Sequence, residues 1–310
     1  MKTAFLFSGQ GAQYNGMGQD FYDEFKEVKQ IFDKASKLLE VDLAEICFDD
    51  DSRLNETAYT QPAILTVSHA IEEVMKKTIG LTPDAVAGLS LGEYTALISS
   101  GSLSLEDAVP LVHQRGSLME KAVPDGEGAM AAILGLDAKA LISICEEVSI
   151  ESYVAIANYN TPGQLVVSGE TEGVEKAMTQ ALNKGAKKAI KLNVSGPFHT
   201  KLLEPAGQAF TKSLAEVKFQ SFNYPVYSNV TANSYPDTEA IKSLLTSQIS
   251  SPVKFEQMIR QMISDGITTF VEVGPGKTLR SFVKNIDRNV TVKNIEKVNQ
   301  LETIAKVIHS

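Results

Sequence analysis

Cysteine is scarce in this sequence, with only Cys47 and Cys145 among 310 residues. The two lie far apart in the chain, and neither belongs to a spacing typical of metal ligands. Cys145 shares a helical face with Leu141 and Val148, so burial accounts for it. We therefore expect both thiols to be inert and we expect no metal site.

Long hydrophobic runs and an excess of basic charge are also absent. No apolar run approaches the roughly 18 residues that a membrane span requires, and Met1–Gly9 is too short for a signal peptide and is typical of a strand. Lys and Arg number 29 against 38 Asp and Glu, and a net charge of -9 argues against nucleic acid, which requires a concentrated basic face. We expect a cytoplasmic protein that binds neither membrane nor nucleic acid.

Two glycine-rich segments lack the spacing of nucleotide-binding motifs. In the loop 8–18, Gly9 and Gly11 are not followed by the glycine at position 14 that a dinucleotide fingerprint requires. In Gly274–Thr278, a phosphate loop would need a glycine where Val271 stands in an apolar strand. We therefore reject nucleotide binding and interpret the second segment as a turn that supports a sheet.

The composition is that of a globular protein, with 43% hydrophobic and 22% charged residues. A chain of 310 residues suffices for one large core with a smaller satellite. Hydrophobic periodicity predicts strands at 3–7, 224–229 and 268–273, and a helix from about Pro62 to Lys77. The acidic run 49–51 is interpreted as a solvated loop.

Residues 125–194 have a different pattern and predict a separate unit. Strands are expected at 129–134, 153–157, 164–168 and 187–194, with helices at 138–148 and 172–183. The order βαββαβ is that of a ferredoxin-like unit, inserted between two pieces of a larger domain, 1–124 and 195–310. Its strands lack the stacking aromatic side chains that RNA binding would require, so we interpret the unit as one wall of a cleft.

The stretch Asp84–Gly101 has the strongest catalytic pattern. A short apolar strand leads into Gly88-Leu89-Ser90-Leu91-Gly92, and a helical pattern follows. A strand-to-helix turn that exposes a serine requires almost no side chain on either flank, and Gly88 and Gly92 satisfy this. Free N–H groups at the helix start can stabilise an oxyanion. We predict that Ser90 is a nucleophile; the alternative is an ordinary glycine and serine turn.

Arg115 is surrounded by apolar residues in a helix that runs to about Lys121. Leu111 and Leu118 lie one turn before and after it on the same face. A buried guanidinium stays charged and needs an anion. Two interpretations remain open: the head reaches water while the stem is packed, or it binds a substrate carboxylate in a bidentate manner.

His199 lies in the segment 195–200, a tight linker before a helix. Among the four histidines, this position at an element boundary is the best suited to a general base. His113, by contrast, lies in the middle of a helix. The alternative is a loop histidine without a catalytic role.

Six motifs taken together are more specific than the serine turn alone. They are GQGAQ after the first strand, GLSLGEY around Ser90, Arg115 in the next helix, GPFH ending at His199, QISSPVKF at 248–255 and VEVGPGKTL near the end. In their order and approximate intervals, the chain closely resembles malonyl-CoA:acyl-carrier-protein transacylases over nearly its whole length. The resemblance implies an α/β fold: an α/β-hydrolase-like large domain with a mostly parallel sheet and an inserted ferredoxin-like small domain.

The resemblance also implies a role for each motif residue. Ser90 resembles the acylated nucleophile, His199 its base, and Arg115 the residue that grips the malonyl carboxylate. Further implied positions are the backbone oxyanion donors Gln10 and Leu91, the histidine-orienting carbonyl of Gln248, and Asn158 beside the pantetheine arm. We also expect Phe198 to limit the room for a methyl branch on the acyl chain. Leu89 departs from the many relatives that have histidine there, and a leucine cannot donate a hydrogen bond.

The implied reaction moves malonyl from malonyl-CoA to the phosphopantetheine thiol of acyl carrier protein. It proceeds by a ping-pong mechanism through a malonyl-serine ester, needs no cofactor, and supplies fatty acid synthesis. We expect a monomer. Because the chain is acidic and its carrier is too, a local basic patch must steer docking. The candidates are two clusters, Lys187, Lys188 and Lys191, or Lys277, Arg280, Lys284 and Arg288.

Three alternatives are kept: a transacylase of a polyketide pathway, a serine esterase or thioesterase, and a non-catalytic scaffold that docks carrier proteins. In hydrolases of this fold an acid lies between the serine and the histidine in sequence. Here the inserted unit occupies most of that stretch, which argues against a hydrolase. The intact set of Ser90, His199 and Arg115 argues against the scaffold.

Overall fold

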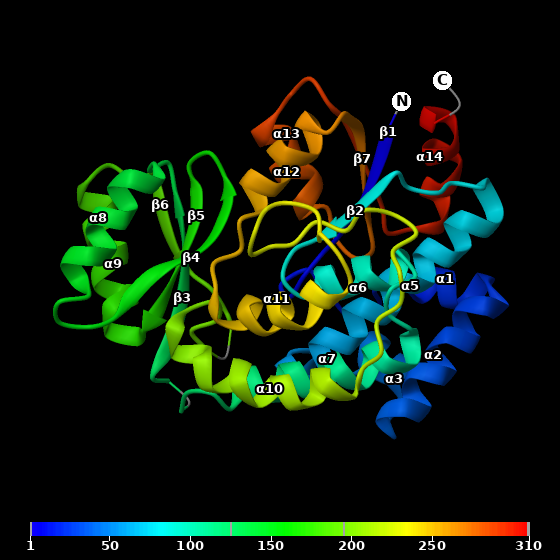
Figure 1. The fold of residues 1–310 in the computed structure, drawn as a ribbon, viewed down its shortest axis with the longest axis horizontal. Helices are drawn as coiled ribbons and strands as arrows, with labels where there is room; N and C mark the ends of the chain where they lie inside the picture. The colour runs from blue at the N-terminus through cyan, green and yellow to red at the C-terminus, as the bar shows by residue number, and fades with distance from the viewer. Residues whose placement is uncertain (1, 125, 195, 309–310) are drawn as a thin grey trace.

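The computed structural model describes residues 2–124, 126–194 and 196–308, which form a large lobe and a smaller one (Figure 1). The large lobe contains a parallel sheet in the order β2-β1-β7-β8. Its strands are β1 (Lys2–Phe7), β2 (Ala85–Gly88), β7 (Ile267–Val273) and β8 (Thr291–Ile295). The expected strands at 3–7 and 268–273 are confirmed, and β8 is an addition to the expected set.

Helices cover both faces of this sheet because its strands are apolar on both sides. In β1, Phe5 and Phe7 pack into one core, whereas Ala4 and Leu6 pack into the other. The first core includes residues of α2 (Lys26–Leu39), α5 (Thr57–Ile79), α6 (Gly92–Ser99) and α7 (Leu105–Glu120). The second includes residues of α12 (Phe255–Ser264) and α13 (Thr278–Ile286).

Three loops meet at the carboxyl edge of the parallel sheet. Because β1, β2 and β7 run in the same direction, the segments that follow them leave the same edge. Ser8 Oγ donates a hydrogen bond of 3.1 Å to the carbonyl oxygen of Pro275. A Cβ on Gly9 would lie 2.3 Å from the carbonyl oxygen of Leu89. The GQGAQ loop therefore lies between the serine turn and the GPGKT turn.

Helix α5 begins at Thr57, well before Pro62, so the predicted start of this helix was wrong. Proline has no N–H, and the carbonyl of Ala58, one turn earlier, cannot receive the usual helical bond from it. His113 Nδ1, on α7, lies 2.9 Å from that carbonyl oxygen and donates to it instead. A proline is tolerated inside this helix because a neighbouring helix supplies the missing donor.

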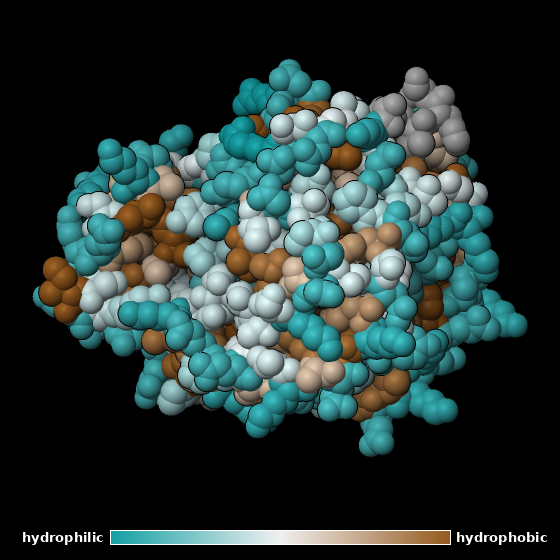
Figure 2. Space-filling view, in the orientation of Figure 1, coloured by the Kyte–Doolittle hydropathy of each residue, from teal (hydrophilic) through white to brown (hydrophobic). Residues whose placement is uncertain are grey.

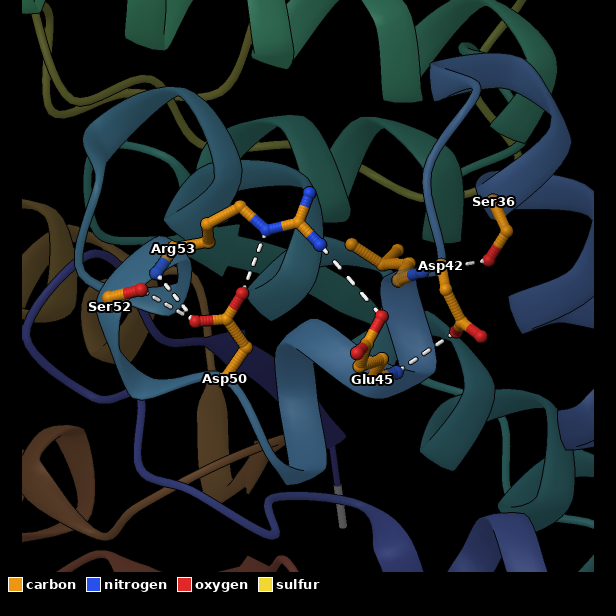
Figure 3. Close-up of polar contacts among 7 residues, drawn as sticks. Ser36, Asp42, Glu45, Asp50, Ser52 and Arg53 are labelled. Carbon is orange, nitrogen blue, oxygen red and sulfur yellow. Dashed lines mark hydrogen bonds and ion pairs between the residues drawn. The ribbon is translucent and has the colours of Figure 1, made fainter.

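The acidic run 49–51 joins two short helices, and the expected loop is limited to Asp49 and Asp50 (Figure 3). Helix α3 (Leu43–Phe48) ends before it, and α4 (Asp51–Leu54) begins within it. Asp50 accepts hydrogen bonds from the backbone N–H of Arg53 at 3.2 Å and from Arg53 Nε at 2.8 Å. The bond from Ser52 Oγ, and then those from Arg53, lower the pKa of Asp50 to about 2. Its carboxylate acts as a helix N-cap, a role that the charge run does not reveal.

The small lobe contains an antiparallel sheet in the order β4-β5-β3-β6. Its elements are β3 (Gly128–Leu134), α8 (Ala138–Val148), β4 (Val154–Thr161), β5 (Gln164–Glu170), α9 (Thr171–Asn183) and β6 (Lys188–Lys191). Along β3, Ala129, Ala131 and Ile133 pack into the core of this lobe. Met130 and Ala132 point the other way and line a cavity between the lobes. The predicted order of strands and helices is confirmed.

Backbone hydrogen bonds join the two lobes. Val253, after α11 (Glu239–Ser250), donates to the carbonyl of Ala157 at 2.8 Å and accepts from the N–H of Tyr159 at 2.9 Å. The edge strand β4 therefore pairs with a segment of the large lobe. Asp125 and Ser195, at which the predicted domain boundaries fall, lie outside the described residues.

The predicted strand at 224–229 was wrong, since Val226 forms only an isolated bridge with Val86. Pro225 has no N–H to donate to a ladder, which limits pairing here. The remaining helices are α1 (Gln19–Glu24), α10 (Glu204–Glu216) and α14 (Leu301–Ile308), with short 3-10 helices at Lys201–Leu203 and Val298–Gln300. Within the described ranges, no helix is long and apolar enough to cross a membrane.

Candidate active site

Ser90 lies on a sharp turn between β2 and α6. Its φ of 54° is in the left-handed region, which a serine rarely adopts. A Cβ on Gly88 would lie 2.0 Å from the carbonyl carbon of Gly92, and one on Gly92 would lie 2.0 Å from the carbonyl oxygen of Phe7. Glycine on both flanks is a steric requirement of this turn, in agreement with the sequence pattern.

His199 lies beside Ser90 and also has a left-handed backbone, with a φ of 60°. Its Nε2 is 2.8 Å from Ser90 Oγ, and its Nδ1 is 2.9 Å from the main-chain oxygen of Gln248. A carbonyl oxygen only accepts hydrogen bonds, so Nδ1 carries the proton and Nε2 accepts the one from Ser90. The pair has the geometry of a nucleophile and its base, with a backbone carbonyl behind the ring where many hydrolases have a carboxylate.

The imidazole of His199 is held in its neutral form. Burial, and then the positive charge of Arg115, lower the pKa of His199 to about 4. The hydrogen bond with the carbonyl of Gln248 acts in the opposite direction and does not outweigh them. At neutral pH the ring is therefore able to accept a proton.

Arg115 projects from α7 and is 1% exposed, so the alternative in which its head reaches water is wrong. Its Nη2 donates to Ser90 Oγ at 3.0 Å and to Gln248 Oε1 at 2.9 Å, and its Nη1 donates to Gln61 Oε1 at 2.8 Å. The guanidinium also lies over the ring of Tyr94, at 5.2 Å from the centroid. All three hydrogen-bond acceptors are neutral. A buried cation therefore lies next to the reactive oxygen and is suited to a substrate anion.

Two backbone N–H groups are available beside Ser90, those of Gln10 and Leu91. Both residues line the cavity that contains Ser90, and in the part of the chain that the structure describes neither N–H donates a hydrogen bond. The N–H of Ser90 itself is occupied, because it donates to Asn229 Oδ1 at 2.6 Å. The two groups expected as oxyanion donors are thus free to bind a substrate oxygen.

A cavity of about 260 Å³ opens over Ser90 between the two lobes. Phe198 and Asn158, both expected at the site, lie in its wall, and Leu89 adds an apolar surface. Asn160 also lines it, and among the described residues its Oδ1 has no hydrogen-bond partner although it is buried. A bound molecule with an N–H or O–H donor would satisfy this atom.

Besides Asn160, three buried polar residues at the site were missed in the sequence. Gln61 lies in α5, Glu93 in the first turn of α6, and Asn229 after the bridge at Val226. Asn229 had a usable signal, because polar residues after apolar strand-like segments mark the carboxyl edge of a parallel sheet. Gln61 and Glu93 lie within helices, where only packing shows which face is buried.

A serine hydrogen-bonded to a neutral histidine, beside free N–H groups and a buried cation, has the geometry of an acyl-transfer site. The family model for the acyl transferase domain matches residues 4–307. The chain therefore belongs to the acyl transferase family, and its relatives identify the member of that family.

The chain is 46% identical to the malonyl CoA-acyl carrier protein transacylase of Bacillus subtilis (strain 168), over 100% of this chain and 97% of that protein. The crystal structure of the malonyl CoA-acyl carrier protein transacylase from Clostridium perfringens is 44% identical, with a TM-score of 0.95 over 100% of this chain and 98% of that one. A type II PKS acyl-carrier protein has been solved in complex with its malonyl-transacylase, a structure that matches at 36% identity with a TM-score of 0.97 over 99% of this chain and 100% of that one. The particular family is that of the malonyl CoA-acyl carrier protein transacylases.

Proposed function

We propose that this chain transfers the malonyl group of malonyl-CoA to the phosphopantetheine thiol of an acyl carrier protein, through a malonyl ester of Ser90. The proposal depends most on one observation, that Ser90 Oγ lies 2.8 Å from His199 Nε2 and 3.0 Å from Arg115 Nη2. The first contact supplies a base for the nucleophile. The second supports a role for Arg115 as the cation that binds the malonyl carboxylate. The names of the relatives support the choice of substrates.

In the first half-reaction, His199 Nε2 takes the proton of the Ser90 hydroxyl while Oγ attacks the thioester carbonyl carbon. Negative charge develops on the carbonyl oxygen, and the N–H groups of Gln10 and Leu91 stabilise it. The C–S bond then breaks, the sulfur of coenzyme A takes the proton from His199 and leaves as the thiol, and the malonyl group remains as an ester on Ser90.

Arg115 selects the acyl group, because malonyl differs from acetyl by one carboxylate that the guanidinium can bind. A carboxylate can accept two parallel hydrogen bonds from a guanidinium, and these are stronger than the bonds to neutral oxygens that Arg115 now makes. An acetyl group has no oxygen to offer there. We assign to Phe198, at the wall of the cavity, the exclusion of a methyl branch.

In the second half-reaction, the thiol of the carrier attacks the ester carbonyl and the same groups act in reverse. Because His199 faces the neutral carbonyl of Gln248, its protonated form lacks the stabilisation that a carboxylate gives. We propose that this favours a thiol over water as the second nucleophile, since a thiol is the more acidic of the two. A serine thioesterase would use the same pair with water and is the second candidate.

We also propose a finer description of the fold, with an α/β-hydrolase-like large domain, 1–124 and 195–310, and a ferredoxin-like small domain, 125–194. In support, the strands of the small sheet lie in the order second, third, first and fourth, with a helix after the first and after the third. The small lobe also has a hydrophobic core of its own.

The carrier would approach the mouth of the cavity between the two basic clusters. Leu192 and Thr278 line the cavity and are adjacent in sequence to Lys191 and Lys277. Lys191 also forms an ion pair of 3.0 Å with Glu175, which reduces the charge that it can present to a partner. A monomeric state, a cytoplasmic location and a role in fatty acid synthesis stay predictions, and the type II PKS relative keeps a polyketide role as the alternative.

Mass spectrometry of the intact protein after mixing with malonyl-CoA tests the proposal. We expect one malonyl group per chain, located at Ser90, with a burst of coenzyme A that stalls until a thiol acceptor is added. Ser90→Ala should stay unlabelled. Steady release of coenzyme A in water alone would favour the thioesterase, and an unlabelled Ser90 in the unaltered protein would contradict the proposal.

A further inference from the structure

A buried carboxylate, that of Glu93, lies behind the proposed catalytic residues and has no part in the reaction described above. Its side chain is 0% exposed in the first turn of α6. One oxygen, Oε2, accepts hydrogen bonds from Gln248 Nε2 at 2.6 Å and from the backbone N–H of Asn229 at 3.1 Å. The other, Oε1, accepts one from Tyr235 OH. Two segments that are distant from Glu93 in sequence, the loop that contains Asn229 and Tyr235 and the helix that contains Gln248, therefore converge on this carboxylate.

Gln248 connects Glu93 to Arg115 and Ser90. Its Oε1 accepts a bond of 2.9 Å from Arg115 Nη2, and its Nε2 donates both to Glu93 and to the carbonyl oxygen of Ser90, the latter at 3.0 Å. If the amide were flipped, its NH₂ would face the guanidinium and its oxygen would face the carboxylate. Donor would then meet donor, and acceptor would meet acceptor. Glu93 thus favours the one amide orientation that suits Arg115.

Asn229 makes the second connection. Its backbone N–H donates to Glu93, while its side chain accepts the N–H of Ser90 at 2.6 Å and donates to the carbonyl oxygen of Gly88 at 2.7 Å. The side chain therefore holds the nucleophile turn at two points. Because Ser90 has a left-handed backbone, it needs such support from its surroundings.

We propose that Glu93 is a positioning residue of the acyl-transfer site: its buried carboxylate sets the amide of Gln248 and the backbone of Asn229, and through them Arg115 and Ser90. This inference rests on the proposed function, because its effect is on the acylation of Ser90. Both donors at Oε2 are N–H groups, so that oxygen carries no proton. Burial raises the pKa of Glu93, and the bonds from Tyr235, Gln248 and Asn229 oppose the rise.

Glu72 provides a matched control. It lies in α5, is also 0% exposed, accepts a hydrogen bond from Ser99 Oγ and pairs with Lys76 Nζ at 2.9 Å. None of these three residues lines the cavity. Removal of either buried carboxylate leaves donors without an acceptor and should lower stability. A loss of stability alone therefore does not distinguish positioning from simple packing.

The experiment measures the first-order rate constant of Ser90 malonylation at saturating malonyl-CoA, for the folded fraction of each variant. We expect Glu93→Ala to lower it on the order of a hundredfold, the effect of a small displacement near reacting atoms. Glu93→Gln should have a rate constant within about threefold of that of the unaltered protein, because its amide oxygen can replace Oε2 and its NH₂ can donate to Tyr235. Glu72→Ala should keep the rate of the unaltered protein.

Two further variants keep the test decisive. Glu93→Asp retains the charge but falls one methylene short of Gln248 and Asn229, so we expect a rate on the order of tenfold lower even if Glu93→Ala does not fold. In a Gln248→Ala background, Glu93→Ala should have much less effect than alone, because the two residues act in one chain of contacts. If the free-energy effects of the two substitutions on the rate are additive, Glu93 does not act through Gln248.

The outcomes separate this inference from the proposed function. If neither the unaltered protein nor Glu72→Ala becomes malonylated, the proposed function fails. If both are malonylated and the folded Glu93→Asp and Glu93→Ala proteins react at the same rate, the reaction stands and the positioning role of Glu93 is wrong.

Discussion

The two lobes meet at one cavity but contribute different chemistry to it. Among the described residues that line it, the charged and titratable side chains, Arg115 and His199, belong to the large lobe. The small lobe contributes apolar side chains and the amides of Asn158, Asn160 and Gln164. A parallel sheet gathers several loops at its carboxyl edge, whereas an antiparallel sheet presents every second residue on one face. Ser90 and His199 therefore lie on loops of the large lobe and Arg115 on its helix α7, whereas the sheet face of the small lobe shapes the cavity.

The lobes also differ at their surfaces. Of the large hydrophobic side chains that are exposed in the described structure, Leu38 lies in the large lobe, and Ile142, Ile150, Leu182 and Ile190 lie in the small one. Hydrophobic surface is accordingly visible on the small lobe at the left of Figure 2. A small unit has too little interior to bury all its apolar residues.

The two lobes contribute different residues to the cavity, and this difference predicts the effects of substitutions. Large-lobe substitutions should lower rate constants, and small-lobe substitutions should weaken binding.

Ser90→Ala and His199→Ala should have the largest effects. Each removes a group that takes part in bond formation, and we expect the rate of acylation by malonyl-CoA to fall by at least about 10⁴-fold. Rapid mixing with detection of released coenzyme A measures this rate, and circular dichroism checks the fold. A small-lobe substitution with an equal loss in rate would contradict the assignment of catalysis to the large lobe.

Arg115→Ala should act on substrate choice. Loss of one partner of a buried charge pair costs roughly 2–5 kcal/mol, or about thirty- to several-thousand-fold in specificity. Transfer of malonyl should fall by that order, while transfer of acetyl is retained or increased, because acetyl leaves no charge unpaired. The ratio of the two transfer rates is the measurement. An equal fall in both would show that Arg115 is only structural.

Asn158→Ala, in the small lobe, should give a smaller effect of a different kind. Loss of one neutral hydrogen bond to the pantetheine arm costs about 1 kcal/mol. We expect KM for malonyl-CoA to rise by up to about tenfold with kcat largely retained. Steady-state kinetics separates the two constants, and a fall in kcat alone would assign catalysis to the small lobe.

The pH dependence should show the smallest effect in the physiological range. His199 acts as a base only when neutral, and its pKa is lowered to about 4. As pH falls, kcat/KM should therefore hold through the ordinary histidine range near 6.5 and decline only close to pH 4. Arg115→Ala removes one cause of the lowered pKa, so its decline should begin at higher pH. Asn158→Ala should not change the pH at which the decline begins.

Much of the small lobe was predictable because its patterns are local. Helix 138–148 and the βαββαβ order follow from periodicity within short segments. The large lobe was harder. Helix α5 tolerates Pro62 only because His113 of another helix bonds to the carbonyl of Ala58. Strand β8 includes the polar residues Lys293 and Asn294, and it pairs with β7, from which helix α13 separates it in the chain. Such features depend on partners that a local window does not contain.

The sequence by itself determined the features that depend on steric and covalent rules within a short segment. Gly88 and Gly92 are required by the turn around Ser90, and the six motifs suffice for the family. Only the tertiary structure decided that Arg115 is fully buried with neutral partners, and that Glu93, Asn229 and Gln248 meet behind the nucleophile. A buried polar group must find a partner wherever packing brings one. That partner comes from a distant segment, so the geometry of the site follows from the way the elements pack together.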